Sequence, residues 1–227
     1  MTNQSHFARA RAFVAVLIAL LWTGSLPAAV MVSPTAATTD MGVSDPQQAA
    51  VTKMIDHSGL DKPFTSGVTD WDAYFDTGDP PFAQAAGGNN WQSAVDFSLP
   101  VSGVVDFDLG AVHPIDRIAI WNISVKDVTI HVSETSFNAL TEVRSYSLPN
   151  HLNFPFSYPH DRLNFGAVHN ARYVRLEIDS VHLFDPNDTF GYAIVGELVA
   201  GSVVPEPAAV ALVAVVAPLL AARRSRQ

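Results

Sequence analysis

The sequence predicts an all-β domain, a jelly-roll β-sandwich, in the middle of the chain. Three observations predict it. Several short segments alternate apolar and polar residues with a period of two, turn residues bound these segments, and helical periodicity is weak throughout. Short strands joined by long loops, with few helices, are typical of a sandwich or jelly roll.

The alternation places successive side chains on opposite faces of a sheet. In one such segment Val105, Phe107 and Leu109 share a face, and Asp106 and Asp108 share the other. Gly and Pro residues stop the alternation at the segment ends. By this pattern we expect strands over 104–109, 115–122, 127–133, 173–178 and 192–200, and a short turn or helix over 50–57.

Composition and charge exclude several classes of protein. The 227 residues contain 13 Lys and Arg against 22 Asp and Glu, a formal net charge of −9, and no cysteine. Within 30–202 the count is 8 basic and 21 acidic residues, a net of 8 − 21 = −13. Such a field repels phosphate backbones, so no nucleic-acid partner is expected. The absence of cysteine excludes a disulfide framework and Cys-ligated metals.

The N-terminal residues 1–29 have the pattern of a secretory signal peptide. Arg9 and Arg11 form a positive start, an apolar run of about ten residues follows over 13–22, and small, turn-forming residues follow over 23–29. The run is too short to span a bilayer comfortably. The alternative is an anchor that is not cleaved. Residues 30–49 are small, polar and proline-containing, and are predicted to be a linker.

The C-terminal residues 202–227 have three parts in order. Pro205-Glu206-Pro207 comes first, a hydrophobic helix over 208–222 interrupted by Pro218 comes second, and an Arg cluster at 223–226 ends the chain. Arginines at both ends would stay cytoplasmic and leave the body outside the inner membrane. The tail resembles a PEP-CTERM sorting signal of Gram-negative bacteria.

The PEP-CTERM resemblance implies an exosortase-type membrane protease as a partner. It further implies transient anchoring in the inner membrane and delivery to the cell surface or extracellular matrix. A plain C-terminal transmembrane anchor is the alternative.

A series of motifs in the region 50–201 resembles the discoidin, or F5/8 type C, family. Asn90-Trp91-Gln92-Ser93 is followed by a strand ending Asp108-Leu109-Gly110, then by Ile115–Trp121, by Ala171-Arg172-Tyr173-Val174-Arg175-Leu176 and by Gly196-Glu197-Leu198. The resemblance implies a galactose-binding-like jelly roll. It also implies non-catalytic binding of extracellular carbohydrate by loops at one end, with an extracellular polysaccharide as the partner.

Sugar binding needs flat aromatic faces and a few directed polar groups. Two loops, over 69–82 and 151–161, offer that mixture. The alternative is that these rings close the ends of the barrel as part of the core. The candidate carbohydrate-binding residues are Trp71, Tyr74, Phe75, Phe156, Tyr158 and His160.

The resemblance also implies a structural Ca²⁺ beside the last strand. Glu197 matches the glutamate that holds it in the family, and Asp70 and Asp72 are the early-loop carboxylates that we expect to join it. Calcium takes six to eight oxygen ligands. The alternative is that these acids are solvated at the surface.

Catalysis is not expected from the motifs. The sequence contains no G-x-S-x-G elbow and no H-E-x-x-H pair. A pair of carboxylates for glycoside hydrolysis stays an open alternative, because the separation that matters is spatial. A non-enzymatic alternative to carbohydrate binding is a structural envelope or exopolysaccharide-matrix protein that makes protein contacts only.

Overall fold

The computed structural model describes residues 28–204 except 47, 85–87 and 154–156. The predicted signal sequence up to residue 27 and the predicted tail from residue 205 lie outside the described residues. The elements are β1 (Ala29–Val32), β2 (Ala36–Thr39), the 3₁₀ helix η1 (Val51–Met54), α2 (Trp71–Phe75), β3 (Ala83–Gln84), β4 (Trp91–Gln92), β5 (Gly103–Asn122), β6 (Val125–Ser133), β7 (Thr141–Ser147), β8 (Ser157–Tyr158), β9 (Asp161–Val181) and β10 (Ile194–Val203).

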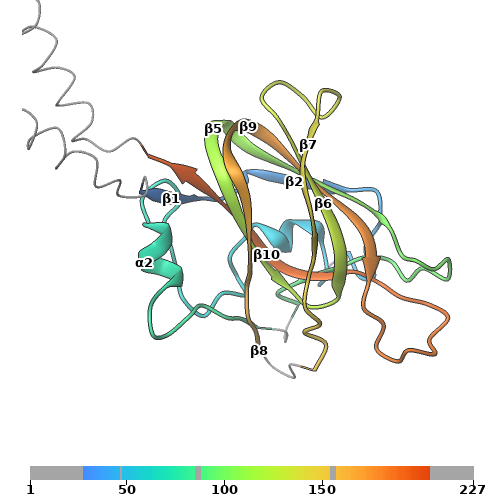
Figure 1. The fold of residues 1–227 in the computed structure, drawn as a ribbon. Coiled ribbons are helices and arrows are strands. Elements are labelled where there is room, and N and C mark those ends of the chain that lie inside the picture. Colours follow the sequence, from blue (N-terminus) through green and yellow to red (C-terminus); the bar gives the residue numbers. More distant parts are fainter. Residues whose placement is uncertain (1–27, 47, 85–87, 154–156, 205–227) are drawn as a thin grey trace, which may run out of the picture.

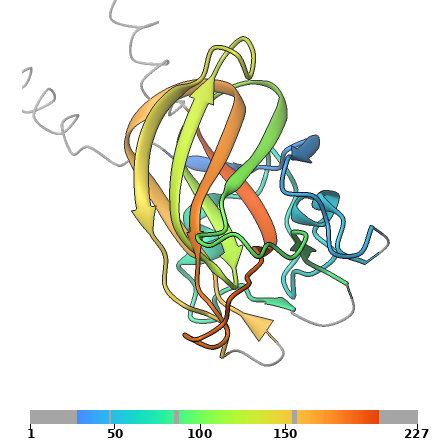
Figure 2. The ribbon, with the colours of Figure 1, turned by 90° about the vertical axis from the view of Figure 1, so that its right-hand side faces the viewer.

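One eight-stranded antiparallel sheet makes up most of the fold. Its main path is β1-β10-β5-β9-β6-β7, with β2 paired to β5 and β4 paired to β10, while β3 and β8 form a separate small sheet. The long strands β5 and β9 change register between their two halves, and Gly110 bends β5 at φ 81°. The sheet therefore curls around its own interior (Figure 1 and Figure 2).

Alternate residues of the sheet face two separate cores. Ile118 and Ile120 belong to the main core inside the curled sheet, together with residues of β6 and β9. Ala119 and Trp121 face the other way, into a second cluster that α2 and the segment before it cover. Helix α2 lies beside β1 on this outer face (Figure 1). The second cluster is called the α2 core below.

The predicted fold class is confirmed, since the described chain is an antiparallel β-sandwich with little helix. Each of the five expected strands lies within or overlaps an observed one, and 104–109 and 115–122 are halves of the single strand β5. The short helix expected over 50–57 is η1. Within the described part of the chain, no helix has the length and hydrophobicity needed to cross a bilayer.

The predicted boundaries at 30–49 and 202–227 need correction. Residues 29–39 are not a linker, because β1 pairs with the end of β10 and β2 pairs with the first half of β5. Four-residue strands are too short to show a sustained alternation, so no pattern of residues predicts them. Ala29 is already the first residue of β1, and β10 extends to Val203, so the folded unit covers at least 29–203.

Candidate functional site

Four strand ends meet at one end of the sandwich. Asn122 at the end of β5 pairs with Val195 near the start of β10, and Val125 at the start of β6 pairs with Val181 at the end of β9. Because these pairs are antiparallel, the connections between these strands gather at the same end. A cavity of about 390 Å³ opens there, and we call it the loop-end cavity.

Buried hydrogen bonds fix the walls of the loop-end cavity. The Asn122 side chain closes the β5–β6 turn by donating to the Val125 carbonyl and accepting from the Val125 N–H, both at 2.8 Å. The Ser124 hydroxyl donates to the Tyr192 carbonyl and accepts from the Ile194 N–H. Satisfied buried polar groups of this kind rigidify the wall of the cavity that Ile123 and Ile194 form.

The lining of the loop-end cavity combines hydrogen-bonding groups with apolar surface. The polar side chains are Ser44, Asp45, Gln48, Asn90 and Gln92, and the apolar ones are Ala49, Ile123, Leu152, Phe184 and Ile194. The Phe184 ring is 56% exposed and rests on Tyr192, with ring centroids 5.4 Å apart. An accessible aromatic ring beside amide and hydroxyl groups is suited to a polyhydroxylated ligand.

Four of the rings predicted to bind carbohydrate are buried in the α2 core. Trp71, Tyr74 and Phe75 lie on one face of α2, and Tyr158 lies on β8; none is more than 3% exposed. The Asp70 side chain caps the helix by accepting from the Ala73 N–H at 2.8 Å. The helix therefore turns these rings toward the sheet. The prediction that they present faces to a sugar is wrong, and the alternative, that they are core, is correct.

Of the two other predicted binding residues, His160 is the one that the structure describes, and it does not define a site either. His160 is half-buried, with its ring 4.6 Å from that of Phe75 and 5.8 Å from that of Trp121. Burial lowers the pKa of His160, and Nδ1 lies 3.3 Å from the Pro81 carbonyl. This histidine packs at the edge of the α2 core and does not line the loop-end cavity. Phe156 lies outside the described residues.

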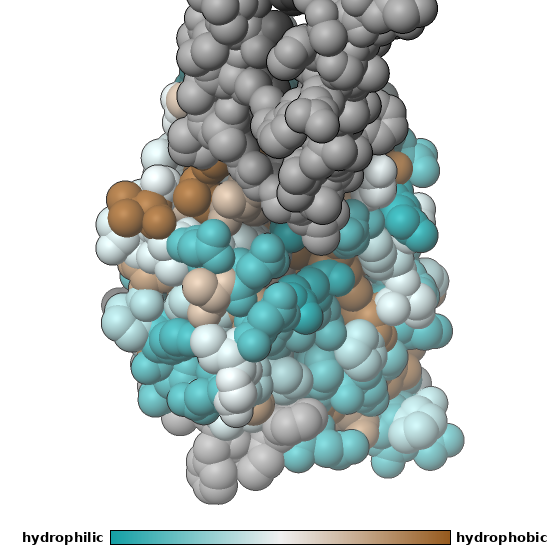
Figure 3. All heavy atoms as spheres, turned by 60° about the vertical axis from the view of Figure 1, so that its left-hand side comes forward, coloured by the Kyte–Doolittle hydropathy of each residue, from teal (hydrophilic) through white to brown (hydrophobic). Residues whose placement is uncertain are grey.

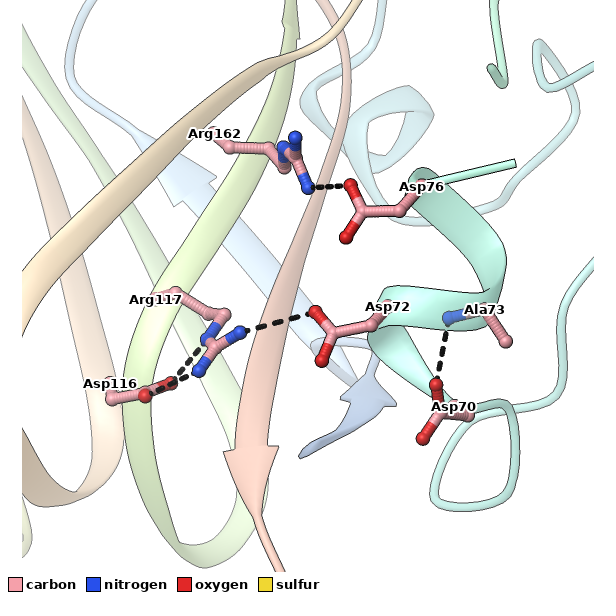
Figure 4. A network of polar contacts seen from close by, with 7 residues as sticks. All are labelled: Asp70, Asp72, Ala73, Asp76, Asp116, Arg117 and Arg162. Atoms are coloured by element: carbon pink, nitrogen blue, oxygen red, sulfur yellow. Dashed lines mark hydrogen bonds and ion pairs between the residues drawn. The ribbon is translucent and has the colours of Figure 1, made fainter. Parts of the chain in front are cut away.

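The carboxylates around α2 are engaged in a polar network (Figure 4). Arg117 on β5 contacts Asp116 at 2.6 Å and Asp72 at 3.5 Å, and Arg162 on β9 contacts Asp76 at 2.5 Å. These contacts join the helix to two strands. Figure 3, which brings the α2 side forward, shows a mostly hydrophilic surface on the coloured part of this face.

The three carboxylates predicted to hold calcium do not come together. Asp70 caps α2, Asp72 contacts Arg117, and the described residues contain no group of three or more acidic or histidine side chains that could hold a metal ion. The predicted set of Glu197, Asp70 and Asp72 is therefore wrong as a set. The physical reason is that the α2 carboxylates serve the helix and its attachment to the sheet.

Glu197 differs from the other two, because its carboxyl group is fully buried on β10 and neither oxygen has a hydrogen-bond partner. Burial raises its pKa to about 9, and the charge of Asp56 adds to the shift. The backbone N–H groups of His57 and Gly59 oppose the shift slightly, although neither makes a well-formed hydrogen bond. Such a group holds either a proton or a cation in the folded state. One carboxylate by itself falls far short of the six to eight oxygens of a calcium site.

Sequence reasoning missed Phe184 and the polar groups of the loop-end cavity. One signal was present: Phe184 stands in the segment His182–Asp188, where Asp, Pro and Asn residues predict turns and no alternation places the ring in a core. The amides of Gln48, Asn90 and Gln92 gave no signal. They come from separate segments that only the strand pairing brings together.

The fold and the site define the class of this protein: an antiparallel β-sandwich with a cavity of about 390 Å³ at its loop end. No protein-family model matches the sequence, and no curated protein matches it. The discoidin and PEP-CTERM resemblances therefore stay predictions.

Solved structures with a similar fold include carbohydrate-binding modules. The family 32 module of C. perfringens NanJ, solved in complex with galactose, is 12% identical with a TM-score of 0.47, and the match covers 76% of this chain and 100% of that one. A chitosan-binding module from a Paenibacillus sp. IK-5 chitosanase/glucanase is 14% identical with a TM-score of 0.49, over 77% and 99% of the two chains. A Clostridium perfringens CBM32, solved with GalNAc-β-1,3-galactose, is 16% identical with a TM-score of 0.44, over 76% and 98%. Likenesses this distant carry no argument about ligands.

Proposed function

We propose that this protein binds extracellular carbohydrate, without catalysis, through the loop-end cavity. The single observation that carries the proposal is the exposed Phe184 ring at the edge of a cavity lined by three amides, a hydroxyl and a carboxylate. A pyranose presents C–H groups on its faces and hydroxyls around its rim, which matches an aromatic surface bordered by hydrogen-bonding groups. This site replaces the aromatic loops predicted from the sequence.

The lining also supports binding without turnover. Glycoside hydrolysis uses two carboxyl groups on either side of the scissile bond. Among the described lining residues, Asp45 is the single carboxylate. A ligand in the loop-end cavity would therefore meet one acid and several neutral hydrogen-bonding groups.

Phe184→Ala tests the site. We expect the substitution to weaken binding to the host's own exopolysaccharide by up to about tenfold. It removes an aromatic ring whose stacking contributes about 0.5–1.5 kcal/mol to the binding free energy. Binding is measured by pull-down and by titration calorimetry on purified oligosaccharides. The matched control is Phe97→Ala, since Phe97 is 76% exposed but does not line the cavity. Equal binding by both variants and the unsubstituted chain would refute the proposal.

A specific observation favours the alternative of a matrix protein that makes protein contacts only. Phe97 and Phe190 are exposed with ring centroids 6.0 Å apart, and Val95 and Leu99, two residues to either side of Phe97, are exposed as well. Clustered exposed apolar side chains often mark protein contacts. The same variant pair separates the two functions. Under the alternative, sedimentation shows self-association that Phe97→Ala abolishes and Phe184→Ala leaves intact, with no dependence on sugar.

We further propose that the chain is exported and sorted to the surface or matrix by an exosortase-type protease that acts on the C-terminal tail. The folded unit supports two boundaries for this processing. Cleavage that preserves β1 must fall before Ala29, and cleavage of the tail must fall after Val203. Mass spectrometry of the protein recovered from the envelope and medium checks both cleavage boundaries. An intact, full-length chain in the cytosol would contradict the proposed export and processing.

Calcium is proposed only at Glu197. Of the three predicted carboxylates it is the one whose oxygens have no partner, so it is the residue that would hold the ion, and it supplies at most two of the six to eight oxygens that calcium takes. When bound, calcium would neutralise a buried charge and tie the early loop near His57 to β10. The role is structural and involves no step of ligand binding.

A further inference from the structure

The sandwich has a second cavity at the end opposite the loop-end cavity. Its volume is about 490 Å³, and it lies at the turn between β6 and β7, beside residues 168–170 in the middle of β9. We call it the hairpin-end cavity. We infer that it is a second carbohydrate site, so that one folded unit binds two glycan chains and cross-links them. The inference goes beyond the proposed site but rests on the proposed function, because it assigns the second ligand to the same class.

Strand β6 separates the two cavities. Its first residue, Val125, pairs with Val181 at the loop end, and its last residue, Ser133, lines the hairpin-end cavity. Nine residues at about 3.3 Å each place roughly 30 Å between these points. In Figure 1 the turn between β6 and β7 forms the upper end of the sheet. One sugar unit is far shorter than this separation, so the two cavities are separate sites.

Hydrogen bonds and a ring contact hold the turn that forms one wall of the hairpin-end cavity. The buried Ser133 hydroxyl accepts from the N–H groups of Thr135 and Ser136, at 3.1 and 3.3 Å. Phe137, in the same turn, packs on Tyr173 of β9 with ring centroids 4.8 Å apart. The hydroxyl therefore closes the start of the turn, and the ring pair attaches its middle to the sheet.

The lining of the hairpin-end cavity offers hydrogen-bonding groups beside apolar surface. Apolar surface comes from Ala139 and from Val168, whose side chain is 52% exposed. Hydroxyl and amide groups both donate and accept hydrogen bonds, and a neutral imidazole has one nitrogen of each kind. These groups belong to Thr135, Thr141, His169 and Asn170. Such a combination fits the rim hydroxyls and the C–H faces of a pyranose.

The charged groups of the lining are as few as at the loop end. Glu134 is the one carboxylate among the described residues that line the hairpin-end cavity, and none of them is Lys or Arg. Glycoside hydrolysis uses two carboxyl groups, so this lining is suited to holding an uncharged glycan without cleaving it. None of these residues is Phe, Tyr or Trp, and we therefore expect weaker affinity here than beside Phe184.

Two separate sites change what the protein does to a polysaccharide. A unit with one site coats a polymer, whereas a unit with two sites joins neighbouring chains. A polymer offers many copies of the same repeat, so two weak contacts on one unit combine into a much stronger attachment. The proposed binding protein would then act as a cross-linker of the polysaccharide.

The number of sites is measured by titration calorimetry of the full chain with short oligosaccharides released from the host's own exopolysaccharide. We expect two sites for the unsubstituted chain and one for Ala139→Trp, because Ala139 is exposed and a tryptophan there fills the hairpin-end cavity. Asn170→Ala removes one hydrogen-bonding group and should weaken the second site by up to about tenfold. The matched control is Ala73→Trp, since Ala73 is also exposed, on α2, and lines neither cavity.

Cross-linking is measured by light scattering of the intact exopolysaccharide. We expect the unsubstituted chain, Ala73→Trp and Phe97→Ala to increase the scattering strongly, and Ala139→Trp to lose most of the increase. Phe97→Ala is included because self-association through the exposed Phe97 would also join polymer chains. One site per unsubstituted chain, or cross-linking that Phe97→Ala abolishes and Ala139→Trp leaves intact, overturns the inference. If a single site then still depends on Phe184, the proposed function survives alone; if no oligosaccharide binds, both fail.

Discussion

Trp71→Ala is expected to lower the free energy of unfolding by about 3–5 kcal/mol, the usual cost of truncating a buried tryptophan. The Trp71 ring is 1% exposed and packs 4.6 Å from Phe75, with the Arg117 guanidinium 5.9 Å from its centre. It also lies so close to Gly201 on β10 that a side chain there would meet it at 3.0 Å. Removing the ring leaves a cavity between α2 and the sheet and breaks the contact that seats the helix.

Urea unfolding followed by circular dichroism measures the loss. Val68→Ala is the control, since Val68 is 71% exposed three residues away and its truncation should cost less than about 0.5 kcal/mol. Glycan affinity of folded Trp71→Ala should be close to that of the unsubstituted chain. If the variant kept normal stability but no longer bound sugar, Trp71 would be a binding residue and the assignment of Phe184 as the stacking ring would be wrong.

The fold was predictable because the long strands carry their own signal. Alternation in β5, β6 and β9 reports directly which face is buried, and the main core follows from it. The strands β1 and β2 were not predictable, since four residues give two side chains per face. Their place is set by pairing with residues about 65 to 175 positions away.

The site was less predictable, because aromatic rings look alike in sequence whether they bind or pack. Trp71, Tyr74 and Phe75 stand among aspartates, which suggested an exposed loop. The i, i+3, i+4 spacing of a single helical turn, capped by Asp70, instead turns all three inward. Phe184, flanked by equally polar residues but without such a turn, stays outside.

Glu197 carries the second large effect: the free energy of unfolding should fall as pH rises from about 5 to about 9. The folded state keeps the Glu197 proton up to a pKa of about 9, whereas the unfolded chain releases it near the ordinary value of 4.5. Between these values the folded state binds more protons, so raising the pH favours unfolding. One such group contributes a slope of up to about 1.4 kcal/mol per pH unit.

Glu197→Gln isolates this contribution, because glutamine keeps the shape of the protonated acid and does not titrate. With EDTA present, the free energy of unfolding is measured by urea unfolding across this pH range. As the pH rises, the value for the variant should increase relative to that of the unsubstituted chain. Other carboxylates contribute equally to both proteins and cancel in the difference. A difference that is constant with pH would mean that Glu197 is not buried as a neutral acid.

Replacing EDTA with calcium then distinguishes the two possible occupants of the Glu197 pocket. A cation that binds only the folded, ionised carboxylate stabilises the folded state by RT ln(1 + c/Kd), where c is the free cation concentration, and it competes with the proton. If Glu197 holds calcium, the ion should raise the melting temperature of the unsubstituted chain most at high pH and leave Glu197→Gln unchanged. One carboxylate supplies only two of the oxygens that calcium requires. A melting temperature that does not depend on calcium would show that Glu197 holds a proton instead. In that case the early loop near His57 is held by packing and hydrogen bonds alone.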